Sequence, residues 1–382
     1  MLHFFRPSLA LPRVPTSTRP FNTPSGQTFM QLTLVVPELI WPEPDDRETL
    51  DALACPGLNT LIARSRLTRR PPQSLEATLG DAFGLSGNVP WGAFRVLGED
   101  QAPSASTADP CWLCADPVHL RLHQEKLILA DAGSLDISLE EAQELTAELN
   151  RQFADIGSFH VATADRWYLQ LAGDTDLGHF DVPPLSVVAG RSVSRQLPET
   201  PEALRLRQLL NEVQMVLYGQ AANERREESG RSTINSLWLW GAGTAPRAST
   251  SDFAGIWGGD VLACGLGRAF GVAVRPPPDD LGALLTQSPG GSRQLLVLDS
   301  LQRPVQYQDA DAYCRQMAEL DKRWFSPLRT ALASGGIGRL RLVAPTTYAV
   351  LVWESGRGEQ WRLWRRPRPL AATAQALARG EE

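Results

Sequence analysis

Apolar, β-branched residues gather in short runs along this chain. Runs of about four to eight such residues, bounded by turn-forming residues, are typical of buried strands. The pattern therefore predicts strands over residues 32–36, 112–120, 126–130, 167–171, 237–240, 294–298, 340–343 and 348–353.

Helical spacing of apolar residues appears in several of the intervals between these strands. It is clearest at residues 138–153, where Ser138 and Glu141 form a capping box ahead of the apolar positions. Further helices are predicted at 49–64 with a break near residue 56, at 201–217 and at 310–332. Because strands alternate with helices, we expect α/β layers with at least a partly parallel sheet.

The two ends of the sequence differ from its body. Residues 1–29 contain five prolines and no acidic residue, and the prolines interrupt any continuous apolar stretch. We expect a disordered leader ahead of Met30 rather than a secretory signal, with a transit-like arm as the alternative. Its deletion should leave the melting temperature unchanged. Residues 365–382 are expected to be a basic, solvated tail with a short helix.

Composition and charge narrow the classes of function. The 382 residues are 43% hydrophobic and 21% charged, which is typical of globular proteins, and the net charge is -6. This charge gives no global basic field for nucleic acid or an acidic membrane. No apolar run reaches the roughly 18 residues of a membrane helix. Five scattered cysteines make no disulfide framework. We expect a cytoplasmic protein that binds neither nucleic acid nor membrane.

A cluster of thiols and imidazoles is the first candidate for chemistry. Cys111, Cys114, His119 and His123 are the side-chain types that bind zinc, but their spacing leaves the chain no room to turn back on itself. Alternation along a strand sends Cys111 and Cys114 to opposite faces. We therefore expect core thiols, with the two sulfurs more than about 5 Å apart, rather than a zinc pair.

Two strand ends carry the other candidates. Gly241 and Gly243 form a glycine turn after the strand at 237–240, where close backbone approach could cradle an anion. Asp299 follows the strand at 294–298 and is placed like a site carboxylate at the edge of a sheet. A second glycine-rich run, residues 255–271, is interpreted as a loop and helix packed tightly against the sheet. The five histidines do not assemble into a nucleophilic triad.

Several segments, in order, resemble a known family. Residues 54–65 (ACPGLNTLIARS) resemble the helix after the first strand in the alkaline phosphatase superfamily. Residues 74–80 (SLEATLG) and 89–98 (VPWGAFRVLG) are similar to the nucleophile region and the next stretch of archaeal-type cofactor-independent phosphoglycerate mutases. Looser matches follow at 131–149, 223–243 and 309–328. The whole pattern looks closest to a degenerate proteobacterial family labelled regulatory protein or phosphoglycerate mutase.

This resemblance implies a fold and a division into domains. It implies an alkaline phosphatase-like α/β core with a mainly parallel sheet flanked by helices, and a smaller inserted α+β domain. The expected ranges are 30–91 and 226–364 for the core, 92–225 for the inserted domain and 365–382 for the tail.

The resemblance also implies site residues. Proteins of that superfamily hold two divalent metals with Asp and His ligands, and these metals activate a serine. Ser74 matches the nucleophile, and Glu38 and Asp299 are the carboxylates left at metal positions. The stretch that would bind the ligand contributes Arg226, Asn235, Gly241 and Gly243.

Most of the implied metal ligands are replaced. Thr78, the run 300–303 (SLQR) and the run 344–347 (APTT) stand where His and Asp ligands belong. We therefore expect a degenerate, non-catalytic protein without a cofactor. It would act through binding, with a small phosphorylated ligand or a protein as the partner.

Two alternatives remain open from the sequence. The first is an active phosphoryl-transfer enzyme that uses Ser74, Glu38 and Asp299 with two Mn or Zn ions in a remodelled site. The second is a structural or partner-binding protein without a small ligand, suggested by the eleven tryptophans.

Overall fold

The computed structural model describes residues 29–379 apart from a few gaps. The gaps are 104–108, 174, 176, 178–180, 194, 195, 197–199, 201, 202, 247–249 and 363. The expected leader at 1–29 lies outside the described residues except for Phe29, as does His179.

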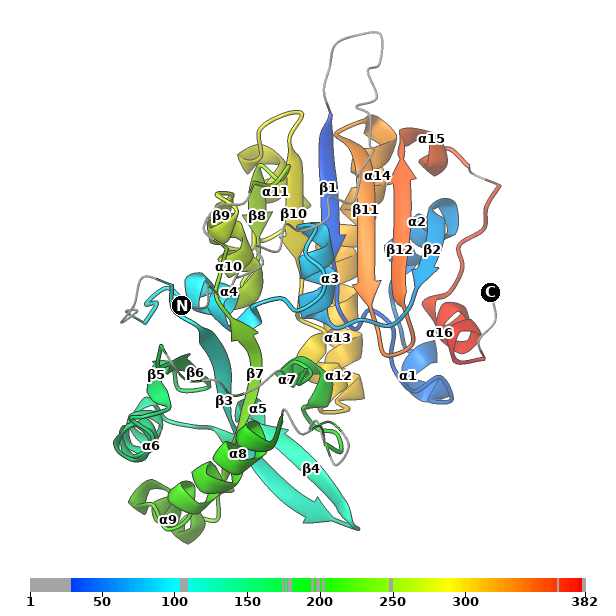
Figure 1. Ribbon diagram of the computed structural model, residues 1–382. Coiled ribbons are helices and arrows are strands. Elements are labelled where there is room, and N and C mark those ends of the chain that lie inside the picture. Colours follow the sequence, from blue (N-terminus) through cyan, green and yellow to red (C-terminus); the bar gives the residue numbers. More distant parts are fainter. Residues whose placement is uncertain are drawn as a thin grey trace.

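A seven-stranded sheet forms the centre of the larger domain (Figure 1). Its strands, in spatial order, are β2 (Arg66–Arg70), β12 (Val350–Gly356), β11 (Ile337–Pro345), β1 (Met30–Val35), β10 (Arg293–Val297), β8 (Gly255–Trp257) and β9 (Ala273–Arg275). The five strands from β11 to β9 are parallel, and β12 runs antiparallel to both of its neighbours. Parallel strands covered on both faces read as nearly continuous apolar runs, as β1 does.

Helices cover both faces of this sheet. One face packs against α2 (Pro56–Arg64), α11 (Leu281–Gln287), α13 (Ala310–Leu320), α14 (Ser326–Ser334) and α16 (Leu370–Ala378). The other face packs against α3 (Leu75–Ala82), α4 (Trp91–Gly98) and α10 (Val261–Ala269). Successive side chains of β1 alternate between these layers, since Leu34 belongs to the first core and Val35 to the second.

A second sheet of five strands forms the smaller domain. It contains β4 (Lys126–Asp131), β3 (Trp112–His123), β6 (Arg166–Leu171) and β5 (Gly157–Thr163), with β7 (Ser236–Gly243) also paired to β3. All of these pairings are antiparallel. The helices α6 (Leu139–Gln152) and α8 (Leu204–Leu217) contribute to its core. The fold class predicted from the sequence is thereby confirmed.

The return from the smaller domain to the core comes later than expected. The sequence placed it at residue 226, but β7 pairs with β3 along most of its length. Its apolar side chains, including Trp238, are buried in the smaller domain. The boundary is corrected accordingly: the chain rejoins the larger sheet only at β8.

The remaining helical segments are short. They are α1 (Arg47–Asp51), α5 (Ala132–Leu135), α7 (Leu185–Val188), α9 (Ala221–Glu228), α12 (Gln302–Gln306), α15 (Arg357–Gln360) and a π-helical turn, Asp321–Phe325, between α13 and α14. Within the described residues, none of the helices combines the length and apolarity needed to cross a membrane.

Candidate functional site

A pocket opens at the carboxyl ends of the central parallel strands. Its volume is about 200 Å³, and its walls come from the segments after β1 and β11 and from the start of α3. The smaller domain adds Ser186, Val187 and Arg191. This edge of a parallel sheet, where loops from several strands converge, is the usual place for a ligand in α/β proteins.

Ser74 lines this pocket, but its hydroxyl serves as a helix cap. It precedes α3 in an extended conformation and accepts a hydrogen bond from the backbone N–H of Ala77 at 3.1 Å. Among the described residues that line the pocket there is no His or Lys to act as a base. The serine predicted as a nucleophile is therefore in the pocket, in the role of a capping residue.

Glu38 is the acidic side chain of the pocket. It follows β1 with a left-handed backbone (φ 55°), and its Oε2 atom is buried without a hydrogen-bond partner. Burial raises the pKa of Glu38 to about 7, against the opposing charge of Arg191. Near neutral pH the carboxyl group is thus divided between its charged and neutral forms.

The donors at this edge do not fit two divalent metals. Thr346 donates its hydroxyl to the carbonyl of Ala349 at 2.8 Å, and Thr347 accepts from Arg191 at 3.5 Å. The Thr78 hydroxyl is buried without a partner. In the part of the chain that the structure describes, no three His, Cys, Asp or Glu side chains come together as a metal-binding group. A divalent ion needs several anionic or imidazole ligands.

Asp299, the second predicted metal carboxylate, lies just after β10 and does not line this pocket. Burial raises its pKa. Burial also raises the pKa of the neighbouring Asp260 to about 6, with a smaller contribution from the charge of Asp299. Glu38 and Asp299 therefore do not form one ligand set within the pocket.

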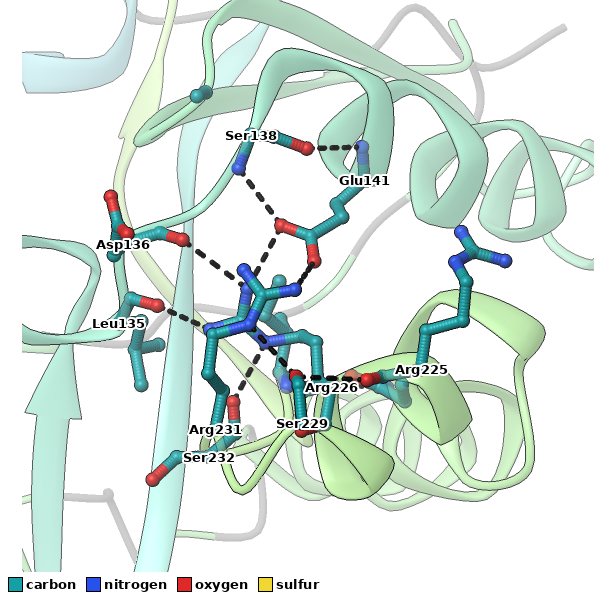
Figure 2. Close-up of polar contacts among 12 residues, drawn as sticks. Leu135, Asp136, Ser138, Glu141, Arg225, Arg226, Ser229, Arg231 and Ser232 are labelled. Atoms are coloured by element: carbon teal, nitrogen blue, oxygen red, sulfur yellow. Dashed lines mark hydrogen bonds and ion pairs between the residues drawn. The ribbon is translucent and has the colours of Figure 1, made fainter.

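Arg226 lies in the smaller domain, away from the pocket, where internal partners surround its guanidinium (Figure 2). It is fully buried and pairs with Glu141 at 2.9 Å. It also donates to the backbone carbonyls of Ser232, at 2.7 Å, and of Leu135. Arg231 holds the other oxygen of Glu141. These partners join α9 to the start of α6, a structural role.

The other predicted ligand-binding residues also meet internal partners. Asn235 donates to the carbonyl and accepts from the N–H of Leu120, at 2.9 and 2.8 Å. Gly241 and Gly243 have positive φ, and side chains there would collide with Trp91 and Pro90. Their close backbone approach accommodates the start of α4. The structure does not bring these three residues or Arg226 to the pocket.

The thiol and imidazole cluster lies on and beside β3. Cys114 is buried in the core of the smaller domain, where burial raises its pKa to about 12, and Cys111 is half-buried. The Nδ1 atom of His119 is 2.8 Å from the carbonyl oxygen of Thr233, and His123 ends β3.

A second hollow of about 200 Å³, which sequence reasoning missed, lies at the junction of the two domains. Glu76 of α3 is buried there and accepts hydrogen bonds from Ser186 at 2.9 and 3.0 Å. Burial raises the pKa of Glu76. Arg95 pairs with the buried Asp116 through two bonds of 2.7 and 2.8 Å. Glu76 and Arg95 lie within the segments 74–80 and 89–98 that resemble the family, but nothing in the sequence pairs Arg95 with Asp116, which lies about twenty residues later on β3.

Comparison with known proteins gives partial matches to one group of enzymes. No protein-family model matches the chain. A probable 2,3-bisphosphoglycerate-independent phosphoglycerate mutase of Geobacter sulfurreducens is 33% identical over 157 residues, which cover 41% of this chain and 39% of that protein. A 2,3-bisphosphoglycerate-independent phosphoglycerate mutase 2 of Methanothermobacter thermautotrophicus is 30% identical over 235 residues, covering 59% and 55%. The chain thus spans about two fifths to just over half of these relatives.

A solved structure of a Pyrococcus horikoshii protein aligns with 91% of this chain and 93% of its own length. The TM-score is 0.57 at 15% sequence identity, which shows a shared fold. The predicted proteobacterial family stays a prediction. The resemblance to cofactor-independent phosphoglycerate mutases, predicted from the motifs, is confirmed as a sequence similarity over part of the chain.

Proposed function

We propose that this chain is a phosphoglycerate mutase-like protein that binds a small phosphorylated ligand without transferring its phosphoryl group, and that it acts in regulation. The observation that carries the proposal is the pocket at the carboxyl ends of β1 and β11. Its position is that of a ligand site, while Thr346 and Thr347 place hydroxyls where the resemblance expects metal ligands.

Binding of an anion is supported by the charges around the pocket. Arg191 reaches it from the smaller domain, and the first backbone N–H groups of α3 begin at its wall. Helix N-termini and guanidinium groups both favour phosphate oxygens. Glu38 repels an anion only when its carboxyl group is charged. Because its pKa is about 7, only part of the Glu38 population is charged at neutral pH.

Absence of phosphoryl transfer is supported by the donor set. The reaction needs cations to neutralise the developing charge and to activate the serine hydroxyl. With Thr78, Thr346 and Thr347 at the ligand positions, neither ion has enough anionic ligands. Ser74 is in addition occupied as the cap of α3.

A second candidate function is transfer to or from Ser74 with Glu38 as general base. The pKa of Glu38, at about 7, suits a base that works near neutral pH. However, Oε2 of Glu38 has no hydrogen-bond partner, so that oxygen does not contact the Ser74 hydroxyl in this structure. A role for Glu38 as base would require the two side chains to approach.

Calorimetric titration tests the binding proposal. Inorganic phosphate and 3-phosphoglycerate are titrated into the wild type, into Arg191→Ala and into Arg121→Ala, whose exposed side chain lies on β3 away from the pocket. We expect binding by the wild type, a loss of about tenfold or more in Arg191→Ala and no change in Arg121→Ala. Equal binding by all three proteins, or none by the wild type, would contradict the proposal.

A further inference from the structure

A groove lined by arginines lies beside the edge strand β2 and shares no lining residue with the pocket. Its volume is about 530 Å³, within the size range of ligand clefts. The groove runs between the β2 side of the larger domain and the segment from α15 to α16, which passes beside β2 in Figure 1.

The charge of this groove is opposite to that of the whole chain. Arg66 of β2 and three arginines of the C-terminal segment line it: Arg362, Arg365 and Arg368. Its acidic lining residue is Glu359, 3.8 Å from Arg362. Four guanidinium groups against one carboxylate give a local excess of positive charge on a chain whose net charge is -6. Such a surface attracts an anionic partner.

The arginines are held in place by the backbone of their segment. The Arg368 N–H donates to the carbonyl of Asn59 at 3.3 Å, and the next turn is fixed by Leu370, whose N–H donates to the side chain of Asn59 at 3.0 Å. Arg365 donates to the carbonyl of Ala63 at 3.4 Å. Asn59 and Ala63 lie on α2, so the basic segment is attached to the core rather than being the solvated tail that the sequence predicted.

Leu67 is the exposed apolar side chain of the groove. It is 36% exposed, whereas Ile62 and Trp353 also line the groove but are buried. Two indole side chains of the same segment are exposed, Trp361 at 59% and Trp364 at 78%. Arginine and tryptophan are the residue types that most often dominate protein interfaces.

From these observations we propose that the groove binds an extended acidic segment of a partner protein, in which acidic and apolar residues alternate. Successive side chains of an extended peptide point in opposite directions. The carboxylates would meet the arginines, and the apolar side chains would meet Leu67. Guanidinium groups bind carboxylates through paired, charge-assisted hydrogen bonds. A nucleic acid would use the charge but not the apolar contact with Leu67.

Fluorescence anisotropy tests this proposal with the full chain. The probe is a short labelled peptide of alternating glutamate and valine, measured at about 0.15 M salt so that distant charges are screened. We expect binding by the wild type and a loss of at least about tenfold in Arg365→Glu and in Arg368→Glu. Arg366→Glu is the matched control, since Arg366 is exposed in the same segment but does not line the groove. It should change affinity by less than about twofold.

Two further probes separate a peptide site from a general polyanion site. A peptide of alternating glutamate and serine should bind at least about fivefold more weakly than the valine peptide, because it cannot make the apolar contact with Leu67. A single-stranded oligonucleotide of equal charge should bind more weakly than the valine peptide. The proposal is overturned if the wild type does not bind the valine peptide, if Arg366→Glu weakens binding as much as Arg365→Glu, if the serine peptide binds equally well, or if the oligonucleotide binds more tightly. Circular dichroism of each variant confirms that it is folded.

Discussion

Ser74 has a structural role at the position where the sequence predicted a nucleophile. Its hydroxyl satisfies the N–H of Ala77 at the start of α3, one of the backbone donors that a helix leaves open. A cap of this kind stabilises a protein by about 1 kcal/mol. The serine is therefore useful to the fold whether or not chemistry occurs.

We expect Ser74→Ala to lower the free energy of unfolding by about 1 kcal/mol, and Ser74→Asp to retain most of it, because aspartate also caps helices. Urea denaturation measures both. A Ser74→Ala variant as stable as the wild type would show that the cap contributes nothing to stability.

Glu38 makes stability depend on pH. Its pKa is about 7 in the folded protein, against 4.5 for a glutamate exposed to water. The folded state thus binds the Glu38 proton more tightly than the unfolded state does. This proton contributes fully to the free energy of unfolding below about pH 4.5, and its contribution is lost as the pH rises through 7. Arg191, which faces Glu38, limits this effect.

Replacing Glu38 by Gln removes this titration. We expect the stability of Glu38→Gln relative to the wild type to increase between about pH 4 and about pH 8, by up to about 3 kcal/mol. Chemical denaturation across this range measures the stability difference between the two proteins. Glu76, Asp260 and Asp299 also have raised pKa values, but they are present in both proteins, so their contributions cancel in the difference. Parallel stability curves for the two proteins would refute the raised pKa.

At the scale of elements, α9 is attached to the smaller domain by the buried Arg226. This helix has little apolar surface of its own, with Ala222, Asn223 and Arg226 as its buried residues. The ion pair with Glu141 and the bonds to backbone carbonyls replace apolar packing (Figure 2). Removing one partner of a buried pair leaves the other without compensation.

We therefore expect Arg226→Met to lower the free energy of unfolding by about 3 kcal/mol. The neighbouring Arg225 pairs with Glu144 at the surface, and Arg225→Met should cost less than about 1 kcal/mol. Thermal or urea unfolding of the two variants measures the difference. Equal losses of stability in the two variants would contradict the prediction that the buried Arg226 stabilises the protein more than the exposed Arg225.

The elements differ in how far the sequence predicted them. All eight predicted strands are present, because apolar side chains on these strands are buried. Among the described residues, four strands were missed because this signal is weak in them. β2 reads RLTRR at an edge of the sheet, β8 and β9 have three residues each, and β5 has only two buried residues. The helix expected at 310–332 contains a π-helical turn at Asp321, whose carboxylate accepts from the N–H groups of Gly57 and Leu58.

The site was predicted only where neighbours in the sequence define it. Ser74 and Glu38 follow from strand ends and motif positions, and both line the pocket. Arg191 and Ser186 reach the pocket from the other domain, and no local pattern could reveal them. Arg226 and Asn235 were interpreted as ligand-binding because they are polar residues within a family motif, whereas their partners are backbone groups of their own domain.

At the scale of the whole molecule, α4 connects the two domains. It crosses α10 so closely that a Cβ atom on Gly98 would lie 1.7 Å from the carbonyl oxygen of Val261. The same holds for Gly265 and the carbonyl oxygen of Phe94. On its other side α4 contacts β3 and β7 of the smaller domain. The close contact with α10 thus holds α4, and the strands β3 and β7 that pack against it, in place relative to the larger domain.

We expect Gly98→Ala to lower stability by about 2 kcal/mol or more, because backbone atoms must move to admit the methyl group. Gly259→Ala is the control: no atom lies within 4 Å of the Cβ position there, and the change should be within about 0.5 kcal/mol. Differential scanning calorimetry compares them. A neutral Gly98→Ala would contradict the tight crossing.

At this scale we propose that the molecule keeps the frame of a phosphoryl-transfer enzyme without its metal-assisted chemistry. The most direct test is turnover by the purified full chain with excess Mn²⁺, assayed for phosphoglycerate mutase and for phosphatase activity beside Ser74→Ala and Glu38→Gln. We predict that all three proteins stay at the protein-free background, since the donors around Ser74 cannot hold two cations. Wild-type turnover that disappears in Ser74→Ala would contradict the account.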